Sequence, residues 1–398
     1  MKTRLATAIA TICAAGLLMP NVSVATGFAD FQQAITDGDA NVKLRYRYER
    51  VDQDNIDKEA NASTLLTRLS YKSADFGGFY TQLEFDNVTA LGNENFNSTV
   101  NGNTNYPVVA DPIGSDFNQA YVGYKTESLH FTAGRQRINH NDQRFVGGVG
   151  WRQNEQTYDG YRLRYDNQSG LNVDYSYIHN VNRIFGTDSP NSDLGGNIHL
   201  LNVTYKINAD HKVAGFAYEL DFDTANAIAT RTLGVSYDGK VSAVNIHAAY
   251  ARQNETGDNP TDFSTDYLAL ELSTKVSAVN VGIGYESLGS DNGKGFTTPL
   301  ATLHKFQGFA DKFLATPGQG INDLYVKASG SIGKLKLLGV WHQFESDVGS
   351  VDYGNEFNFN ATYPVYKNTN FLLRYANYSA DDFAVDTNKL WAMMAFTF

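Results

Sequence analysis

Cysteine, proline and long apolar runs are all scarce in this chain. Its 398 residues include one cysteine, Cys13, and 8 prolines. A single thiol cannot build a disulfide framework or a cysteine metal site. After residue 25, no apolar run approaches the roughly 20 residues that a membrane-spanning helix requires, and the mean hydropathy is −0.36. These shortages exclude a disulfide-stabilised scaffold and a helical membrane protein.

Basic residues are also outnumbered. The 32 Lys and Arg residues face 43 Asp and Glu residues, which gives a formal net charge of −11 at pH 7. This balance argues against a nucleic-acid partner, because nucleic-acid-binding proteins present a basic surface. The sequence has no glycine-rich phosphate loop between a strand and a helix, and no spaced metal-ligand motif such as an EF-hand. We therefore expect no required cofactor, no metal and no energy-coupling domain.

The first 25 residues have the pattern of a signal peptide. Lys2 and Arg4 precede a short apolar run over residues 5–18, and residues 23–25 read Ser-Val-Ala, a small-residue cleavage site. We expect cleavage after Ala25. The alternative is an N-terminal membrane anchor, against which the shortness of the apolar run argues. Residues 1–25 thus predict export through the inner membrane.

Residues 26–40 are expected to form a short periplasmic segment ahead of the main domain. Apolar residues at Phe28, Phe31, Ala34 and Ile35 have helical spacing, and the pattern stops at residues 37–38, Asp-Gly. This spacing predicts a helix over residues 28–36. A disordered leader is the alternative that the sequence leaves open.

What the chain has in abundance is aromatic residues in alternating patterns. It contains 24 Tyr and 24 Phe. Strict alternation of apolar and polar residues is typical of strands with two different faces. In residues 41–51 the apolar face is Val42, Leu44, Tyr46 and Tyr48, and the polar face is Lys43, Arg45, Arg47 and Glu49. Residues 390–398 alternate in the same way and finish on Phe398, an ending that resembles the signal read by the barrel-assembly machinery of the outer membrane.

About eighteen such strands, within a range of 16–20, can be counted over residues 41–398. Short links, for example residues 125–128 and 237–240, alternate with long loops such as 88–114, 139–150 and 287–319. Short periplasmic turns and long outer loops are the expected asymmetry of an outer-membrane barrel. The sequence therefore predicts an all-β fold, a transmembrane antiparallel β-barrel in the cell outer membrane, in contact with lipid and lipopolysaccharide.

Charged residues at alternate strand positions are expected to face the lumen, because lipid exposure would cost several kcal/mol each. We estimate hairpin register from the turn centres, which sets Arg45 and Arg47 beside Arg68, and Arg68 beside Glu84. An arginine belt of this kind would attract anions by field focusing. The alternative is that these arginines only pair with neighbouring acids and stiffen the wall. The predicted pore-lining residues are Arg45, Arg47, Arg68, Glu84, Asp86, Arg152, Arg162, Arg164 and Arg374.

The densest motif runs from residue 133 to 159 and covers the third outer loop with its flanking strands. The loop combines apolar residues that need burial with polar residues that need partners, and folding into the lumen would satisfy both demands. Gly147, Gly148 and Gly150 would permit the tight path. Arg135 is an exception, because strict alternation places it on the lipid face. The predicted constriction residues are Asn141, Asp142, Arg144, Phe145 and Trp151.

Within this motif lie residues 134–136 (Gly-Arg-Gln), 142–147 (Asp-Gln-Arg-Phe-Val-Gly), 151–154 (Trp-Arg-Gln-Asn) and 156–159 (Gln-Thr-Tyr-Asp). Together with residues 44–49 (Leu-Arg-Tyr-Arg-Tyr-Glu), they resemble the alginate-export family of outer-membrane porins. The resemblance implies an eighteen-stranded barrel with a narrowed, arginine-rich lumen, which in the characterised branch passes an acidic polysaccharide outwards. Glu84 and Asp86 dilute the arginine belt, so the resemblance implies a channel more strongly than it implies alginate.

The leading interpretation is a passive outer-membrane porin for small or oligomeric hydrophilic, anionic solutes such as acidic saccharides, narrowed by loop 3. The alternatives are a polysaccharide export pore, like that for alginate, and a non-conducting adhesive or structural barrel with loops 88–114 and 287–319 as binding surfaces. An outer-membrane enzyme would need a histidine and a carboxylate near the rim. The candidates are His140 with Asp142, and His342 near Glu345 and Asp347; we expect no enzyme.

Overall fold

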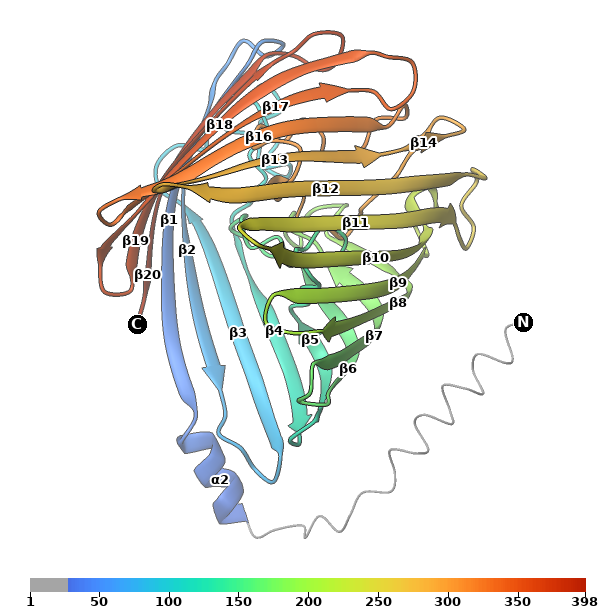
Figure 1. Cartoon of the computed structure of the whole chain (residues 1–398). Helices are drawn as coiled ribbons and strands as arrows, with labels where there is room; N and C mark the ends of the chain where they lie inside the picture. Colours follow the sequence, from blue (N-terminus) through green and yellow to red (C-terminus); the bar gives the residue numbers. More distant parts are fainter. Residues whose placement is uncertain (1–27) are drawn as a thin grey trace.

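The computed structural model describes residues 28–398, so the predicted signal peptide over residues 1–25 lies outside the described residues. One helix precedes a long series of strands (Figure 1). The elements are α2 (Phe28–Thr36), β1 (Asp39–Gln53), β2 (Ala60–Lys72), β3 (Phe79–Ala90), β4 (Gly114–Lys125), β5 (Leu129–Gln136), β6 (Thr157–Asp166), β7 (Leu171–Asn182), β8 (Asp193–Lys206), β9 (His211–Phe222), η1 (Asn226–Ile228), β10 (Thr230–Val241), β11 (Val244–Glu255), β12 (Ser264–Val276), β13 (Val279–Leu288), β14 (Ser290–Asp291), β15 (Lys294–Gly295), η2 (Leu303–Lys305), β16 (Ile321–Ile332), β17 (Leu335–Glu345), β18 (Asp352–Tyr366), β19 (Thr369–Ser379) and β20 (Thr387–Thr397).

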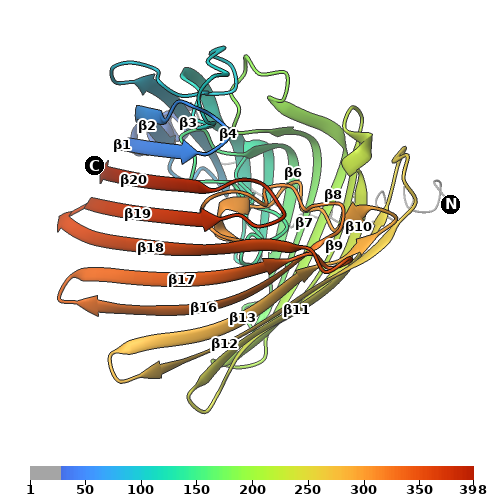
Figure 2. The same cartoon turned by 90° about the horizontal axis from the view of Figure 1, so that it is seen from above.

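The strands close into one barrel. Each barrel strand pairs antiparallel with its neighbours in sequence, and β1 pairs with both β2 and β20, which completes an 18-stranded sheet. β14 and β15 form a separate two-stranded hairpin. Figure 2 shows β20 beside β1 at the closure. The predicted fold class and the predicted number of eighteen strands are confirmed.

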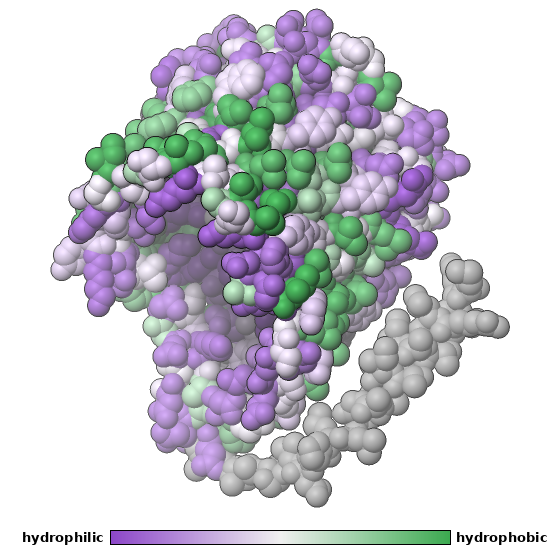
Figure 3. Space-filling view, in the orientation of Figure 1, coloured by the Kyte–Doolittle hydropathy of each residue, from purple (hydrophilic) through white to green (hydrophobic). Residues whose placement is uncertain are grey.

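Alternation decides which side chains face inwards. In β2, Thr64, Leu66 and Arg68 are buried, whereas Leu69, between two inward residues, is 50% exposed. A strand with period two presents one row of side chains to the lumen and the other to the outside. Apolar residues cover much of the outer surface, and a hydrophilic hollow opens at one end of the barrel (Figure 3). The sequence pattern therefore assigns the two faces of the wall.

The turns and loops sort by length as predicted, with one difference. The predicted short link over residues 237–240 is part of β10, and the turn lies at residues 242–243, with Ser242 at a φ of 56°. Asp238 and Gly239 are typical turn residues, but Asp238 accepts a hydrogen bond from Nδ1 of His247 on β11 at 2.7 Å. This cross-strand contact extends the hairpin by several residues.

Helix α2 lies against the turn between β2 and β3 (Figure 1). The backbone N–H of Ala74 donates to the carbonyl of Ala34 at 2.9 Å, and the rings of Phe31 and Phe76 meet edge to face at 5.9 Å. The helix occupies the range that the apolar spacing predicts. Among residues 28–398, no helix is long and apolar enough to cross a membrane.

Two outer loops fold into the barrel. Loop 3 (residues 137–156, between β5 and β6) and loop 7 (residues 289–320, between β13 and β16) meet at a parallel bridge between Val146 and Leu300. Their apolar side chains join inward residues of β7 to β13 and β16 to β20 in one buried cluster, which includes Phe296, Phe313 and Trp391. This cluster fills much of the lumen on that side. The sequence predicted the inward path of loop 3 but treated residues 287–319 as an outer loop.

Candidate functional site

The first row of predicted cations, on β1, is covered by loop 3. Arg45 donates from Nε to Oε1 of Gln153 and from Nη1 to the carbonyl of Gly150, both at 2.8 Å. Arg47 is fully buried, donates to Asp111 at 2.9 Å, and lies 4.5 Å from the centre of the Trp151 ring. Both guanidinium groups therefore anchor loops to the wall.

Arg152 also faces the lumen, but from loop 3 rather than from strand six, where the sequence had placed it. It pairs with Glu49 at 3.0 Å and with Asp311 of loop 7 at 3.3 Å. β6 begins only at Thr157, because residues 150–156 bond to the lumen wall instead of to a neighbouring strand. Burial lowers the pKa of Arg152, but Glu49 and the nearby aspartates outweigh it and raise the pKa.

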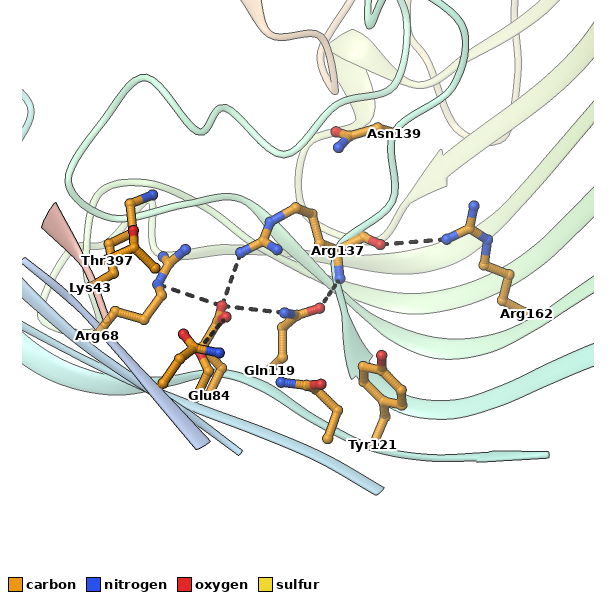
Figure 4. Close-up of a pocket in the computed structure, with 12 residues that line it drawn as sticks. Lys43, Arg68, Glu84, Gln119, Tyr121, Arg137, Asn139, Arg162 and Thr397 are labelled. Atoms are coloured by element: carbon orange, nitrogen blue, oxygen red, sulfur yellow. Dashed lines mark hydrogen bonds and ion pairs between the residues drawn. The ribbon is translucent and has the colours of Figure 1, made fainter. Parts of the chain in front are cut away.

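A second group of charges lies between β2, β3 and loop 3. Arg68 donates from Nη2 and Nε to Asp86 at 2.6 and 2.7 Å, and its Nη1 lies 3.0 Å from Glu155. Arg137 binds Glu84 at 2.9 Å (Figure 4), and it also binds Glu155. We call Arg68, Arg137, Glu84, Asp86 and Glu155 the charged partition.

The predicted hairpin register is wrong by two residues in both hairpins. Arg68 lies opposite Lys43 and Asp86, not opposite Arg45 and Glu84. The turn centres are displaced by one residue from those assumed, and such a displacement moves cross-strand partners by two positions. Because the slip is even, each residue keeps its predicted face.

Three further cations face the lumen on β1 and β6. Arg162 pairs with Asp174 of β7 at 2.5 Å. Among the described residues, Lys43 and Arg164 have no carboxylate within 4.0 Å, and Nε of Arg164 is buried without a hydrogen-bond partner. These two side chains therefore differ from the arginines of β1 and β2, which form hydrogen bonds or ion pairs with groups of the loops or strands.

Arg374 on β19 is held by aromatic rings rather than by acids. Its guanidinium carbon lies 4.1 Å from the ring centre of Trp151 and 4.0 Å from that of Phe309. Its Nη1 lies 2.7 Å from Nε2 of His304, whose Nδ1 lies 2.7 Å from Asp311. An arginine can only donate, so Nε2 accepts, Nδ1 carries the proton and the imidazole is neutral. Burial, with the charges of Arg374 and Arg152, lowers the pKa of His304 to about 3 against the opposing pull of Asp311.

The remaining predicted loop residues are divided between buried anchors and a polar edge. Arg144 is 1% exposed and donates from Nε to Glu286 of β13 at 2.6 Å. Phe145 packs on Phe216 at 4.7 Å. At the edge, the amide of Asn141 donates to Asn202 at 3.2 Å, and the carbonyl of Asp142 accepts from Lys305.

The glycines of loop 3 act by their small size rather than by their backbone angles. Positive φ occurs instead at Asn141, Gln143 and Val149 of this loop, at 48°, 71° and 48°. A Cβ on Gly147 would collide with the Thr302 hydroxyl of loop 7, and one on Gly148 would lie 2.9 Å from Arg137. The absence of a side chain at Gly147 lets the two loops approach closely, and its absence at Gly148 leaves room for Arg137.

The backbone position of Arg135 has the outward parity that strict alternation requires, but its side chain is among those that line a hollow with Asp86 and Glu155. It pairs with Asp159 at 2.9 Å and with Asp116 at 3.2 Å, at the end of the barrel that carries the long loops. Gly134, which precedes it, has a φ of 123°. The two aspartates thus neutralise the charge locally.

The histidine pairs that an enzyme would need are not formed as the sequence suggested. His140 bonds through Nδ1 to the hydroxyl of Tyr218 at 3.1 Å, and its Nε2 lies 3.6 Å from Asp174 rather than beside Asp142. His342 pairs with Asp323 at 2.9 Å. Within residues 28–398, no three His, Cys, Asp or Glu side chains are grouped to hold a metal ion.

Two polar hollows lie on either side of the charged partition. The inner hollow, about 620 Å³, opens towards the C-terminal end of β20 and is lined by residues that include Lys43, Arg68, Arg137, Arg162 and Glu84 (Figure 4). The outer hollow, about 270 Å³, lies towards the long loops and is lined by residues that include Asp86, Asn118, Glu155 and Arg183. A solute passing between them would meet the partition.

Several residues of this site escaped the sequence reasoning. Asp111 and Glu155, which bind the predicted arginines, lie in loops, and loop carboxylates are usually solvated. Burial opposes ionisation of Glu155, but Arg68 and Arg137 lower its pKa to about 2. Arg137 shares the outward parity of Arg135, yet turns inwards because β5 ends at Gln136. No local sequence pattern marked Glu286 or His304 as site residues. The apolar residues of loop 7 were a usable signal that this loop is buried.

Three crystal structures show the same fold at low sequence identity. Pseudomonas aeruginosa OccK9 (OpdG) has a TM-score of 0.72 and 14% identity over 92% of this chain and 99% of that chain. The outer membrane protein OpdK from P. aeruginosa has a TM-score of 0.71 and 12% identity, with 92% and 99% covered. Acinetobacter baumannii OccAB4 has a TM-score of 0.70 and 13% identity, with 91% and 98% covered. At these identities the likeness establishes the fold alone.

Among curated proteins, no sequence matches this chain. The model of the family described as Alginate export matches residues 39–286, which span the first twelve strands and nearly all of β13. That range includes the β1 cations, the charged partition and loop 3. Because the match covers more than half of the sequence, the chain belongs to the alginate export family of outer-membrane β-barrels.

Proposed function

We propose that this barrel is a passive porin for small or oligomeric hydrophilic solutes that carry negative charge, such as acidic saccharides. The observation that carries the proposal is the inner hollow, whose lining includes four cationic side chains, Lys43, Arg68, Arg137 and Arg162, and one carboxylate, Glu84. A cleft lined mainly by one sign of charge, with low-dielectric walls, concentrates ions of the opposite sign.

The route that we propose follows the inner wall from β1 to β7. The apolar cluster of loops 3 and 7 packs mainly against the remaining strands, and Phe296 and Leu300 of loop 7 are fully buried in it. Loop 3 then acts as the size filter, because its residues 150–156 cover β1 and supply Glu155 to the partition. Both hollows lie along this wall.

The two roles considered for the arginines are divided among them. Arg45 and Arg47 are buried and bound to loop groups, which suits a structural role. Lys43 lines the inner hollow, and neither Lys43 nor Arg164 has a carboxylate partner among the described residues, so neither charge is cancelled by a nearby acid. We therefore assign anion preference mainly to Lys43 and Arg164.

The test is the reversal potential of the purified protein in a planar bilayer under a tenfold potassium chloride gradient. We expect the double variant Lys43→Gln/Arg164→Gln to shift the reversal potential towards cations while current persists. Arg252→Gln is the matched control, because Arg252 is 55% exposed on the outer face of β11. An unchanged reversal potential in the double variant would reject the charge assignment, and absence of current from the wild type would reject the channel.

A second candidate is an export pore for an acidic polysaccharide, which the family description favours. Its distinguishing property would be occupancy by a long polyanion rather than by single ions. Oligouronates added to the side of the inner hollow should then block chloride current more strongly as their length grows. Equal block by monomer and oligomer would favour the general porin.

A further inference from the structure

The charged partition is the boundary between the two hollows. Arg68 and Glu84 line the inner hollow, and Asp86 and Glu155 line the outer hollow. Arg68 connects the other three groups, since it lies within 3.5 Å of Glu84, Asp86 and Glu155. A solute that moves from one hollow to the other along this wall has to pass the partition.

One pair within the partition is fixed by the barrel. Arg68 on β2 and Asp86 on β3 lie opposite each other in register and form two hydrogen bonds, at 2.6 and 2.7 Å. Bidentate pairing of a guanidinium with a carboxylate is strong and geometrically specific. Both side chains are nearly buried, at 5% and 7% exposure. This pair belongs to the wall.

The other members can exchange partners. Arg137 follows the last residue of β5, and its side chain is 28% exposed, the most exposed of the partition. It contacts Glu84 of β3 and Glu155 of loop 3. The amide of Asn118 donates to Glu84 at 2.6 Å and to Glu155 at 3.1 Å. If Arg137 moves away, both carboxylates therefore keep a donor.

The charges of the partition oppose the passage of an anion while it is closed. Two guanidinium groups, those of Arg68 and Arg137, face three carboxylates, so the formal sum is 2 − 3 = −1. An anion gathered in the cation-rich inner hollow meets guanidinium groups that are already occupied. It can advance only by taking the place of a carboxylate that the protein itself supplies.

We propose that Glu84 and Glu155 serve as a built-in substitute for the permeating anion and hold Arg137 until a carboxylate or phosphate of the solute displaces them. The inference rests on the proposed channel function and adds the residues that gate it. The guanidinium keeps an anionic partner during the exchange, because one oxyanion takes the place of another. Arg137 is the moving part, and loop 3 keeps its other anchors at Arg144 and Arg152.

The experiment compares Glu155→Gln with Arg137→Gln in planar bilayers, under tenfold gradients of potassium chloride and then of potassium acetate. Both variants break the contact between Arg137 and Glu155, so conductance should rise in both. Glu155→Gln leaves Arg137 held by Glu84 alone, and its anion-to-cation permeability ratio should rise roughly tenfold, within the range produced by charge-lined clefts. Arg137→Gln removes the exchanging cation, and its ratio should fall.

Asp266→Asn is the matched control, since it also removes one carboxylate, from a side chain that is 50% exposed on the outer face of β12. Its ratio should equal that of the wild type. Movement of both partition variants in the same direction would mean that the partition is only a steric plug, and would overturn the inference. An unchanged ratio in Glu155→Gln would do the same. A wild type without current would remove the channel function and this inference with it.

Discussion

One buried ion pair contributes to the attachment of loop 3 to the far wall, and Glu286→Gln tests its contribution. The pair joins Nε of Arg144 to Oε1 of Glu286 at 2.6 Å, with side-chain exposures of 1% and 8%. The substitution keeps the shape and an acceptor oxygen but removes the negative charge. Arg144 would remain buried with neutral acceptors only, Thr298 and Gln307, each at 3.2 Å.

The expected cost follows from that geometry. Removing one partner of a buried pair costs about 3–5 kcal/mol when the other charge is left unpaired. The retained oxygen and the two neutral acceptors reduce this to about 2–3 kcal/mol, since hydrogen bonds to charged groups contribute about 1.5–3 kcal/mol. Loop 3 avoids the cost by leaving the lumen. Its opening equilibrium should therefore increase roughly 30- to 150-fold, at about 1.4 kcal/mol for each factor of ten.

Limited trypsin digestion of the detergent-solubilised barrel measures this opening. Arg144 and Arg152 are buried in the closed loop, and cleavage after them requires the open form. When opening is fast relative to cleavage, the cleavage rate follows the open population. Asp266→Asn is the control, because an exposed pair contributes about 0–1 kcal/mol. Loop-3 cleavage of Glu286→Gln within twofold of the wild type would refute the reasoning. So would strict additivity with Arg144→Met, because residues in contact should couple.

Two further predictions concern loop 7. The pKa of His304 is lowered from 6.5 to about 3, so its contribution to loop attachment is complete above pH 6.5 and declines by roughly 1.4 kcal/mol per pH unit as the pH falls towards 3. Single-channel current noise in the wild type should therefore rise between pH 7 and pH 4. An equal rise in His304→Phe would contradict this prediction. Phe313 is 5% exposed and packs on Phe344 at 4.6 Å, so Phe313→Ala should lower the stability of the closed loop by about 3–5 kcal/mol and raise conductance. Leu314 is 47% exposed, so the control Leu314→Ala should not raise conductance. Equal conductance in the two variants would show that Phe313 does not hold the loop.

The wall of the barrel was predictable because its information is local. Period-two alternation assigned Arg45, Arg68 and Glu84 to the lumen, and the structure has them on that face. The register between paired strands was harder to predict from the sequence, because it requires the centre of each turn to be known to within a single residue. The estimate placed Arg68 beside Glu84, whereas it lies opposite Asp86. The assignment of residues to the inner or outer face therefore stayed correct, although the register error changed every cross-strand neighbour.

The loop partners of the cations were not predictable from spacing alone. Asp111 lies 64 residues from Arg47, and Glu155 lies 87 residues from Arg68. No local pattern joins such pairs. The usable signal for an inward-folded loop was the presence of large apolar residues that need burial. This argument was applied to Phe145 and Trp151 but not to loop 7. Phe296 and Phe313 are buried in that loop, and the same argument would have predicted its inward path.

The site shows why a count of arginines is a poor guide to selectivity. A guanidinium that is buried against a carboxylate presents little field to a solute, because the two charges cancel at short range. Arg47 with Asp111 is such a pair, with both side chains at 0% exposure. Lys43 lines the inner hollow without such a partner among the described residues. We therefore expect permeation to depend on the cations whose nearest carboxylate is missing, as at Lys43, or exchangeable, as at Arg137.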